Sequence, residues 1–230
     1  MSIAENIAQV RANMAAAARA AGRDPGEILL VGASKMNDAA ACREAVAAGI
    51  DALGENRVQE MTAKLADHAY DGAPLHFIGH LQRNKVKQVV GKVDLIESVG
   101  SLALLNAIES TAAGLDLIQN VLLEVNIGEE EAKSGFLPKD LPAGAEAALE
   151  CPHIKVLGLM AIPPANVDRV ENCRYFEKVW TLFVDISAKL YHNSLQQLSM
   201  GMSADYEDAI RAGATMVRVG SAIFGSRHYT

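Results

Sequence analysis

Eight short apolar runs alternate with helix-like stretches along this chain of 230 residues, and this alternation restricts the fold more than any other feature. The runs lie at residues 28–35, 50–54, 75–79, 93–99, 117–127, 154–161, 195–200 and 216–224. Strands that alternate with helices pair in parallel through crossover helices. Eight such units in about 230 residues predict an α/β fold, a (β/α)₈ TIM barrel, with a doubly wound open sheet as the alternative.

An extra helix is expected ahead of the first strand. Residues 3–21 are rich in alanine, and Ile3, Ile7, Val10 and Met14 recur at helical spacing. Because α/β barrels of about 200–250 residues fold as one unit, we expect a single domain that spans residues 1–230.

Charge and composition argue against several classes of protein. The net charge is −7 and no basic block occurs, so nucleic acid is not an expected partner. No stretch is long and apolar enough to span a membrane, and the N-terminus lacks the pattern of a secretory signal. The three cysteines, Cys42, Cys151 and Cys173, match no metal or disulfide spacing. We therefore expect a cytoplasmic protein without a metal site.

The ends of the predicted strands carry the candidate functional residues, because the active face of a (β/α)₈ barrel lies at the carboxyl ends of its strands. These positions hold Lys35, Asn56, His80, Ser199, Gly220 and Ser221. An amine at the mouth of an apolar core can have its pKa lowered by desolvation and can then attack a carbonyl. Acidic residues other than Glu55 are scarce among the strand ends, which argues against a metal site or a pair of catalytic carboxylates.

The last two strands add an arginine and a set of glycines and serines. Arg218 lies in the middle of strand eight, where both faces are covered, so its charge needs a partner. That partner is either a carboxylate on a neighbouring strand or an acceptor on a ligand. Residues 199–203 and 220–221 offer backbone amides and hydroxyls after strands seven and eight, where barrels commonly bind phosphate.

Seven segments in order along the chain resemble the pyridoxal phosphate homeostasis protein family. They read LVGASK at residues 30–35, GENRVQE at 54–60, HFIGHLQ at 76–82, KSGF at 133–136, GLM at 158–160, LSMGMS at 198–203 and VRVGSAIFG at 217–225. The resemblance implies a barrel like the N-terminal domain of alanine racemase, and it implies pyridoxal 5′-phosphate (PLP) as the cofactor.

The same resemblance implies roles for individual residues. Lys35 would hold PLP as a reversible Schiff base, and Arg218 would meet the pyridine nitrogen. Ser199, Gly220 and Ser221 would hold the phosphate, while Asn56 and His80 would lie near the ring. The full set of implied cofactor-binding residues is Lys35, Asn56, His80, Ser199, Met200, Arg218, Gly220 and Ser221.

Two positions depart from the family pattern. Residues 36–38 read Met, Asn and Asp, where the family often has threonine, lysine and proline. Arg83 stands where a serine is usual, whereas Lys133 keeps its family position. If the second lysine of the family hands PLP on, this chain lacks it at that place.

The chemistry of arginine favours binding over catalysis. A guanidinium keeps its proton, so it would leave the ring nitrogen of PLP unprotonated and the ring a poor electron sink. We therefore expect a monomeric protein of vitamin B6 homeostasis that binds PLP and supplies it to PLP-dependent apo-enzymes. The alternatives are a small amino-acid racemase or other PLP enzyme of the same fold, and a lysine Schiff-base aldolase that binds a sugar phosphate without a cofactor.

Overall fold

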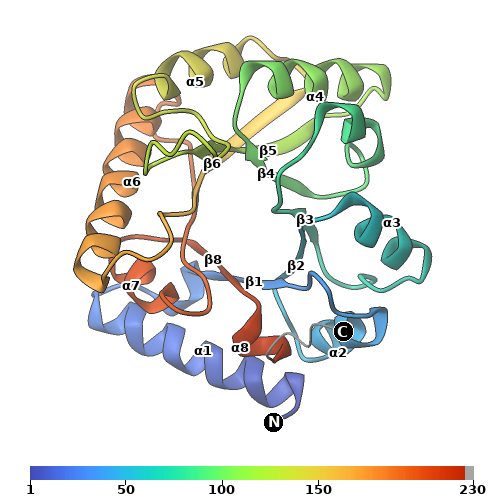
Figure 1. The fold of residues 1–230 in the computed structure, drawn as a ribbon, viewed down its shortest axis with the longest axis vertical. Coiled ribbons are helices and arrows are strands. Elements are labelled where there is room, and N and C mark those ends of the chain that lie inside the picture. The colour runs from blue at the N-terminus through green and yellow to red at the C-terminus, as the bar shows by residue number, and fades with distance from the viewer. Residues whose placement is uncertain (226–230) are drawn as a thin grey trace.

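The computed structural model describes residues 1–225, and its strands form one closed parallel barrel (Figure 1). The strands are β1 (Leu29–Ala33), β2 (Ala52–Glu55), β3 (Leu75–Phe77), β4 (Leu95–Val99), β5 (Gln119–Val125), β6 (Ile154–Ala161), β7 (Gln197–Ser199) and β8 (Met216–Val219). Strand β8 closes the barrel by pairing with β1, with Val31 opposite Arg218. The predicted TIM barrel is confirmed, and the doubly wound sheet is ruled out.

Helices surround the barrel on all sides in Figure 1. They are α1 (Ile3–Ala20), α2 (Ala39–Ala47), α3 (Val58–Ala66), α4 (Leu102–Gly114), α5 (Leu141–Leu149), α6 (Arg169–Leu190), α7 (Tyr206–Arg211) and α8 (Ser221–Phe224), with 3-10 helices η1 (Pro25–Glu27) and η2 (Arg83–Gln88). The stretch between β3 and β4, predicted as a helix, is thus a 3-10 helix and not an α-helix.

The predicted extra helix is α1, and it packs beside α7 and α8 (Figure 1). It begins with a capping box, because the Ser2 hydroxyl accepts from the Glu5 amide and the Glu5 carboxylate accepts from the Ser2 amide. Asn6 donates to the Ile223 carbonyl at 2.8 Å and Asn13 donates to the Tyr206 hydroxyl at 3.1 Å. These bonds attach α1 to α8, which follows β8, and to α7, which precedes it.

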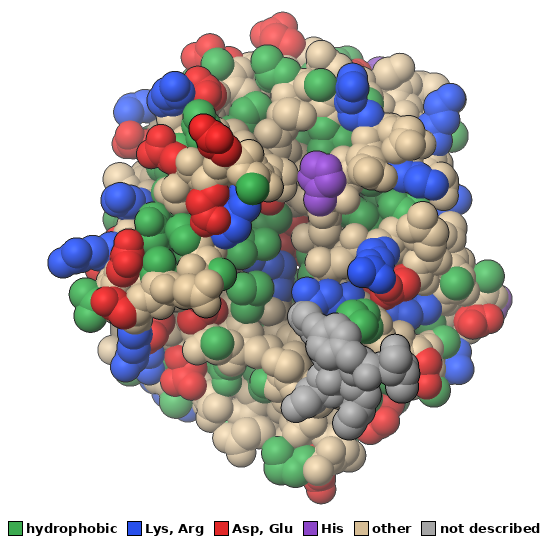
Figure 2. Space-filling model, in the orientation of Figure 1, with side chains coloured by type: hydrophobic (Ala, Val, Ile, Leu, Met, Phe, Trp, Pro, Cys, Tyr) green, Lys and Arg blue, Asp and Glu red, His purple; other side chains and the backbone are tan. Residues whose placement is uncertain are grey.

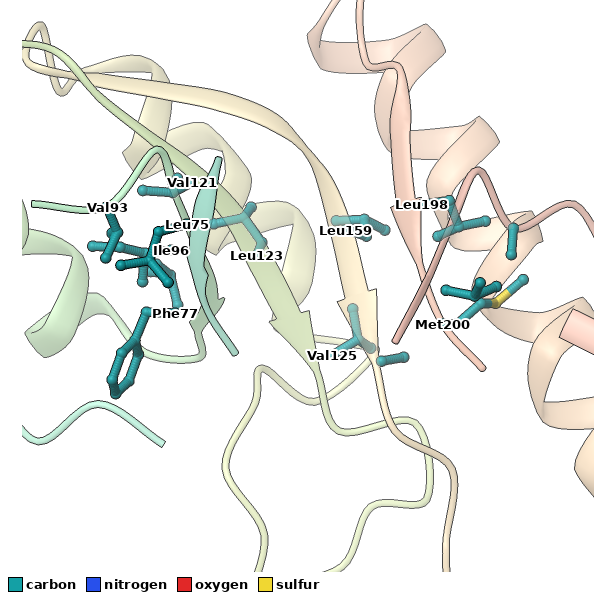
Figure 3. Close-up of a cluster of buried hydrophobic side chains, with 14 of the residues drawn as sticks. Leu75, Phe77, Val93, Ile96, Val121, Leu123, Val125, Leu159, Leu198 and Met200 are labelled. Atoms are coloured by element: carbon teal, nitrogen blue, oxygen red, sulfur yellow. The ribbon is translucent and has the colours of Figure 1, made fainter. Parts of the chain in front are cut away.

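Two apolar clusters lie on opposite faces of the barrel wall. The larger cluster fills the space between strands and helices and includes Phe77, Leu123 and Leu198 (Figure 3). The smaller cluster consists of side chains on the inner face of the strands, namely Val31, Ala52, Leu95, Leu122, Met160 and Met216. Since side chains alternate along a strand, Glu124 and Arg218, two residues beyond Leu122 and Met216, also point into the barrel.

Five strands, β1, β3, β5, β7 and β8, end earlier than the apolar runs predict, and the ends of β1 and β8 matter most for the site. Strand β8 stops at Val219, so that Gly220 turns the chain and Ser221 opens α8. Strand β1 stops at Ala33, so that Lys35 lies in the turn that leads to α2. Both segments therefore leave the barrel at its carboxyl end, on neighbouring strands.

Two structural features bear on the classes that composition argued against. Within residues 1–225, no helix is long and apolar enough to cross a lipid bilayer. In the same part of the chain, no cluster of three or more His, Cys, Asp and Glu side chains is arranged to hold a metal ion.

Gly158 and Gly114 give a matched test of the barrel wall. A Cβ atom at Gly158 would lie 1.6 Å from the Gln197 carbonyl oxygen on β7, whereas a Cβ atom at Gly114 at the end of α4 meets nothing within 4 Å. We expect Gly158→Ala to lower the free energy of unfolding by about 3 kcal/mol, because backbone must shift to admit the methyl group. Gly114→Ala should leave it unchanged or raise it by up to about 1 kcal/mol. Denaturant unfolding of both variants measures this, and equal effects would contradict the strand contact.

Candidate functional site

Lys35 lies half-buried at the carboxyl end of the barrel, in a turn whose backbone is fixed by hydrogen bonds. The Ser34 amide donates to the Gly54 carbonyl at 3.0 Å, and the Ser34 hydroxyl donates to Glu55 Oε1 at 2.6 Å. Asn37 donates its side-chain amide to the Lys35 carbonyl at 3.1 Å. The turn that carries the lysine is thus tied to β2 on one side and to the start of α2 on the other.

Arg218 lies inside the barrel below this turn, and its guanidinium is bonded to protein groups. It is 4% exposed, donates to the Ser199 hydroxyl at 2.5 Å and donates to the Ala161 carbonyl at 3.0 Å. The Ser199 hydroxyl donates in turn to Glu97 Oε2 at 2.6 Å, and Glu97 Oε1 lies 2.8 Å from His76 Nδ1. A continuous polar chain therefore crosses the barrel from β8 through β7 and β4 to β3.

The charged groups in this series of hydrogen bonds stabilise one another. Burial lowers the pKa of Arg218, and the carboxylates of Glu97 and Glu124 oppose that shift. Burial also acts to raise the pKa of Glu97, but the hydrogen bond and charge of His76 and the charge of Arg218 outweigh it and hold this pKa below its ordinary value. Glu97 is therefore ionised, and Arg218 has the carboxylate partner that its position in β8 predicted as one alternative, at 3.8 Å.

The side chains of Ser199 and Met200 both lie buried in the barrel wall and interior. Ser199 is fully buried, and its hydroxyl is bonded to Glu97 and Arg218, so it supports the arginine. The Met200 side chain is fully buried on the outer face of the barrel, among the apolar residues around Leu198 (Figure 3). This side chain therefore cannot contact a ligand at the barrel mouth.

Ser203 ends the segment 199–203 that the sequence predicts to offer amides and hydroxyls, and it lies in the loop after β7. Its hydroxyl accepts from the Gly220 amide at 3.1 Å and from the Ala222 amide at 3.3 Å, so it joins the loop after β7 to the turn after β8. Ser221 lies exposed at the start of α8. A Cβ atom at Gly220 would lie 3.3 Å from the Ala33 carbonyl oxygen, which shows how closely this turn approaches the end of β1.

Asn56 and His80 lie at neighbouring strand ends, as the sequence predicts. A Cβ atom at Gly79 would lie 2.3 Å from the Asn56 carbonyl oxygen, so the segments after β2 and β3 touch. Asn56 Oδ1 is buried and has no hydrogen-bond partner among the described residues, whereas the His80 side chain is exposed. Asn56 thus offers an unsatisfied acceptor beside the turn of Lys35, which suits a polar ligand.

Acidic residues are scarce at the strand ends, as the sequence indicates, but buried carboxylates are present inside the barrel. Glu124 is 8% exposed, its Oε1 accepts from the Ser134 hydroxyl at 3.1 Å, and its Oε2 has no partner in the described part of the chain. Burial raises the pKa of Glu124, against the bond from Ser134 and the charges of His80 and Arg218. Glu97 and Glu124 precede the last residues of their strands, so an inspection of strand ends missed them. The alternation of side chains along each strand is the signal that finds them.

A hollow lies over the carboxyl end of the barrel, and Figure 2 shows Lys and Arg side chains in and around it. A cavity of about 1030 Å³ lies beside α1 and α7; its lining includes Met202, Ser203, Ala222 and Lys133 but not Lys35 or Arg218. Lys133 Nζ lies 3.0 Å from Glu130 and 3.3 Å from the Pro163 carbonyl oxygen. The carboxyl end of the barrel therefore combines lysine and arginine side chains with neutral hydrogen-bonding groups.

Comparison with known proteins assigns this chain to a protein family. The alanine racemase N-terminal domain family matches residues 6–228. Over 229 residues the chain is 44% identical to the pyridoxal phosphate homeostasis protein of Pseudomonas aeruginosa, which covers 99% of this chain and 97% of the relative. The chain belongs to the pyridoxal phosphate homeostasis protein family. The resemblance read from its seven segments is therefore confirmed.

Solved structures of this family and of racemases differ in their similarity to the chain. The structure of PipY of Synechococcus elongatus PCC7942 with PLP bound is 33% identical, with a TM-score of 0.85, and the match covers 97% of this chain and 100% of that chain. Alanine racemase of Clostridium difficile 630 is 19% identical, with a TM-score of 0.68, over 88% of this chain and 53% of the racemase chain. The racemase shares the fold alone, so the homeostasis family is the closer guide to function.

The ionised state of Glu97 gives a test of the interior chain. Glu97→Gln should lower the free energy of unfolding by about 3 kcal/mol near neutral pH, because Arg218 would lose its buried partner. A carboxyl group with a lowered pKa stabilises the fold above its unfolded pKa of about 4.3 and ceases to do so as pH falls through its folded pKa. The difference between the two proteins should therefore shrink in acid. Denaturant unfolding between pH 7 and about pH 3 measures it. Exposed Glu146→Gln serves as the control, and a difference independent of pH would contradict the ionised state.

Proposed function

We propose that this protein binds PLP reversibly at the carboxyl end of its barrel and serves vitamin B6 homeostasis. The observation that carries the proposal is the turn of Lys35, which lies next to the Gly220 turn on the neighbouring strand, above the buried Arg218. The PLP-bound PipY structure, which matches the chain over almost its whole length, supports the same reading.

The residues present fit the cofactor. PLP supplies an aldehyde that an amine can bind reversibly and an aromatic ring that can withdraw electrons. The amine of Lys35 would form the covalent imine. The phosphate would bind the Ser221 hydroxyl and would replace the Ser203 hydroxyl as the acceptor of the Gly220 and Ala222 amides. Asn56 Oδ1 supplies an acceptor near the ring. His80, at the exposed rim, would cover the ring from the side of β3.

Arg218 makes binding a better proposal than catalysis. A guanidinium carries five N–H donors, of which the bonds to Ser199 and Ala161 occupy two. A donor from Arg218 to the ring nitrogen would leave that nitrogen without a proton, since arginine does not give its own proton up. The ring would then be a weak electron sink, and the protein would have little amino-acid chemistry of its own.

Delivery is the second part of the proposal. A protein that holds PLP through a reversible bond at an open barrel mouth can release it to PLP-dependent apo-enzymes. We place this role in the cytoplasm and assign it to a monomer.

Lys35 can be tested directly. The purified protein mixed with PLP should turn yellow, and borohydride should fix the cofactor to Lys35, as located by mass spectrometry of peptides. Lys35→Ala should lose both the colour and the label because no other amine occupies that turn. Exposed Lys87→Ala should behave as the unmodified protein does. A colourless protein that takes up no PLP would defeat the proposal and would favour an aldolase that needs no cofactor.

Delivery can be tested by following reactivation of a PLP-dependent apo-enzyme. We expect PLP-loaded protein to restore its activity, while protein in which borohydride has fixed the cofactor to Lys35 should restore none. Free PLP at the same concentration and loaded protein behind a dialysis membrane serve as controls. No reactivation by the loaded protein, under conditions in which free PLP reactivates fully, would contradict a role in supply.

A further inference from the structure

A second lysine, Lys64, lies buried directly behind the turn of Lys35. It extends from α3, is 7% exposed and donates to the Ser34 carbonyl at 2.9 Å and to Glu55 Oε1 at 2.6 Å. Glu55 is fully buried at the end of β2. This ion pair lies in the barrel wall and is not among the groups proposed to contact PLP.

The contacts of Lys64 and Glu55 converge on Ser34, the residue before Lys35. The Ser34 amide is bonded to Gly54 and its hydroxyl to Glu55, while its carbonyl accepts from the Lys64 ammonium and, at 3.1 Å, from the Asn37 amide. Glu55 Oε1 also accepts from the Tyr70 hydroxyl at 3.0 Å. Every polar atom of Ser34 thus forms a hydrogen bond, and one of these atoms is the carbonyl oxygen of the peptide group that joins Ser34 to Lys35.

Helix α3 holds the other side of the turn as well. Met36 has a φ of 63°, a left-handed conformation that costs a residue with a side chain about 1 kcal/mol or more. Its amide donates to Glu60 Oε2 at 2.8 Å. Glu60 and Lys64 lie four residues apart and therefore on one face of α3, so the same helix face binds the backbone before and after Lys35.

Burial of this ion pair is not explained by stability alone. Removing two charges from water costs several kcal/mol per ion, and apolar residues of similar volume often stabilise a core as well or better. Glu55 Oε2 moreover has no hydrogen-bond partner within residues 1–225, so the pair is incompletely satisfied. What the pair does supply is an oriented donor for the Ser34 carbonyl.

We propose that Lys64 is a positioning residue, whose ammonium group holds the Ser34–Lys35 peptide in the orientation that Lys35 needs to bind the aldehyde of PLP. Lys64 acts through the backbone and does not touch the ligand. This inference rests on the proposed function, because it assigns Lys64 a part in the same site.

Two variants separate positioning from stability. Lys64→Met should lower the melting temperature, because Glu55 is left buried without its counter-charge. It should also weaken PLP binding about tenfold or more, since small displacements of a reacting group carry costs of that order. In Glu55→Gln/Lys64→Met no charge is left buried, so the melting temperature should recover. Its affinity for PLP should stay weak, because the Ser34 carbonyl still lacks the ammonium donor.

The measurements are the absorbance of bound PLP during titration, the yield of borohydride labelling at Lys35 and the melting temperature without PLP. Exposed Lys87→Met is the control and should change none of them. If the double variant recovers affinity together with stability, Lys64 is only structural and the inference is wrong. If the unmodified protein does not bind PLP, the proposed function fails with it, so the two failures are distinguishable.

Discussion

The charge of Arg218 inside the barrel is the constraint on which the rest of the site depends. A guanidinium that is 4% exposed cannot remain in an apolar interior without partners. Glu97, Ser199 and the Ala161 carbonyl supply them, and His76 Nδ1 lies 2.8 Å from Glu97 Oε1 on its other side. Five strands therefore contribute to one polar layer, where most barrels of this kind have branched apolar side chains.

This polar layer separates the apolar interior near the amino ends of the strands from the candidate site at their carboxyl ends. Towards the amino ends of the strands the interior is apolar, with Leu95, Leu122 and Met216 in contact. The polar layer follows, and above it lie the turns that carry Lys35 and Gly220. Because β1 and β8 are paired with Val31 opposite Arg218, the closure of the barrel itself brings the arginine, the lysine turn and the glycine turn to one place.

The sequence predicts the barrel well because the evidence for it is repeated eight times, and an error in one strand end changes little. It also places Lys35, Asn56 and Gly220 at the carboxyl ends of strands, although β1 and β8 end before Lys35 and Gly220, inside the predicted runs. It does not give the direction of a side chain where one residue decides it. Ser199 and Ser203 lie in one short segment, and only the last residue of β7 determines which hydroxyl points inward and which joins the turn after β8. The Met200 side chain takes the outer face because its neighbour Ser199 takes the inner face.

The two buried cations, Arg218 and Lys64, are both paired with carboxylates and carbonyl groups, but they lie in different parts of the barrel. Arg218 sits inside the barrel, where its remaining donors can reach a ligand, and its partners are side chains and a carbonyl on the strands β6, β7 and β4. Lys64 sits in the wall, where its partners are the Ser34 carbonyl and Glu55, and it can act only on the backbone. A flexible lysine such as Lys35 loses conformational entropy whenever it binds a ligand. A backbone already fixed on both sides reduces that loss, because only the side chain remains to be ordered. In the proposed function, the rigid backbone at Ser34 and the charge of Arg218 would thus both favour the binding of PLP.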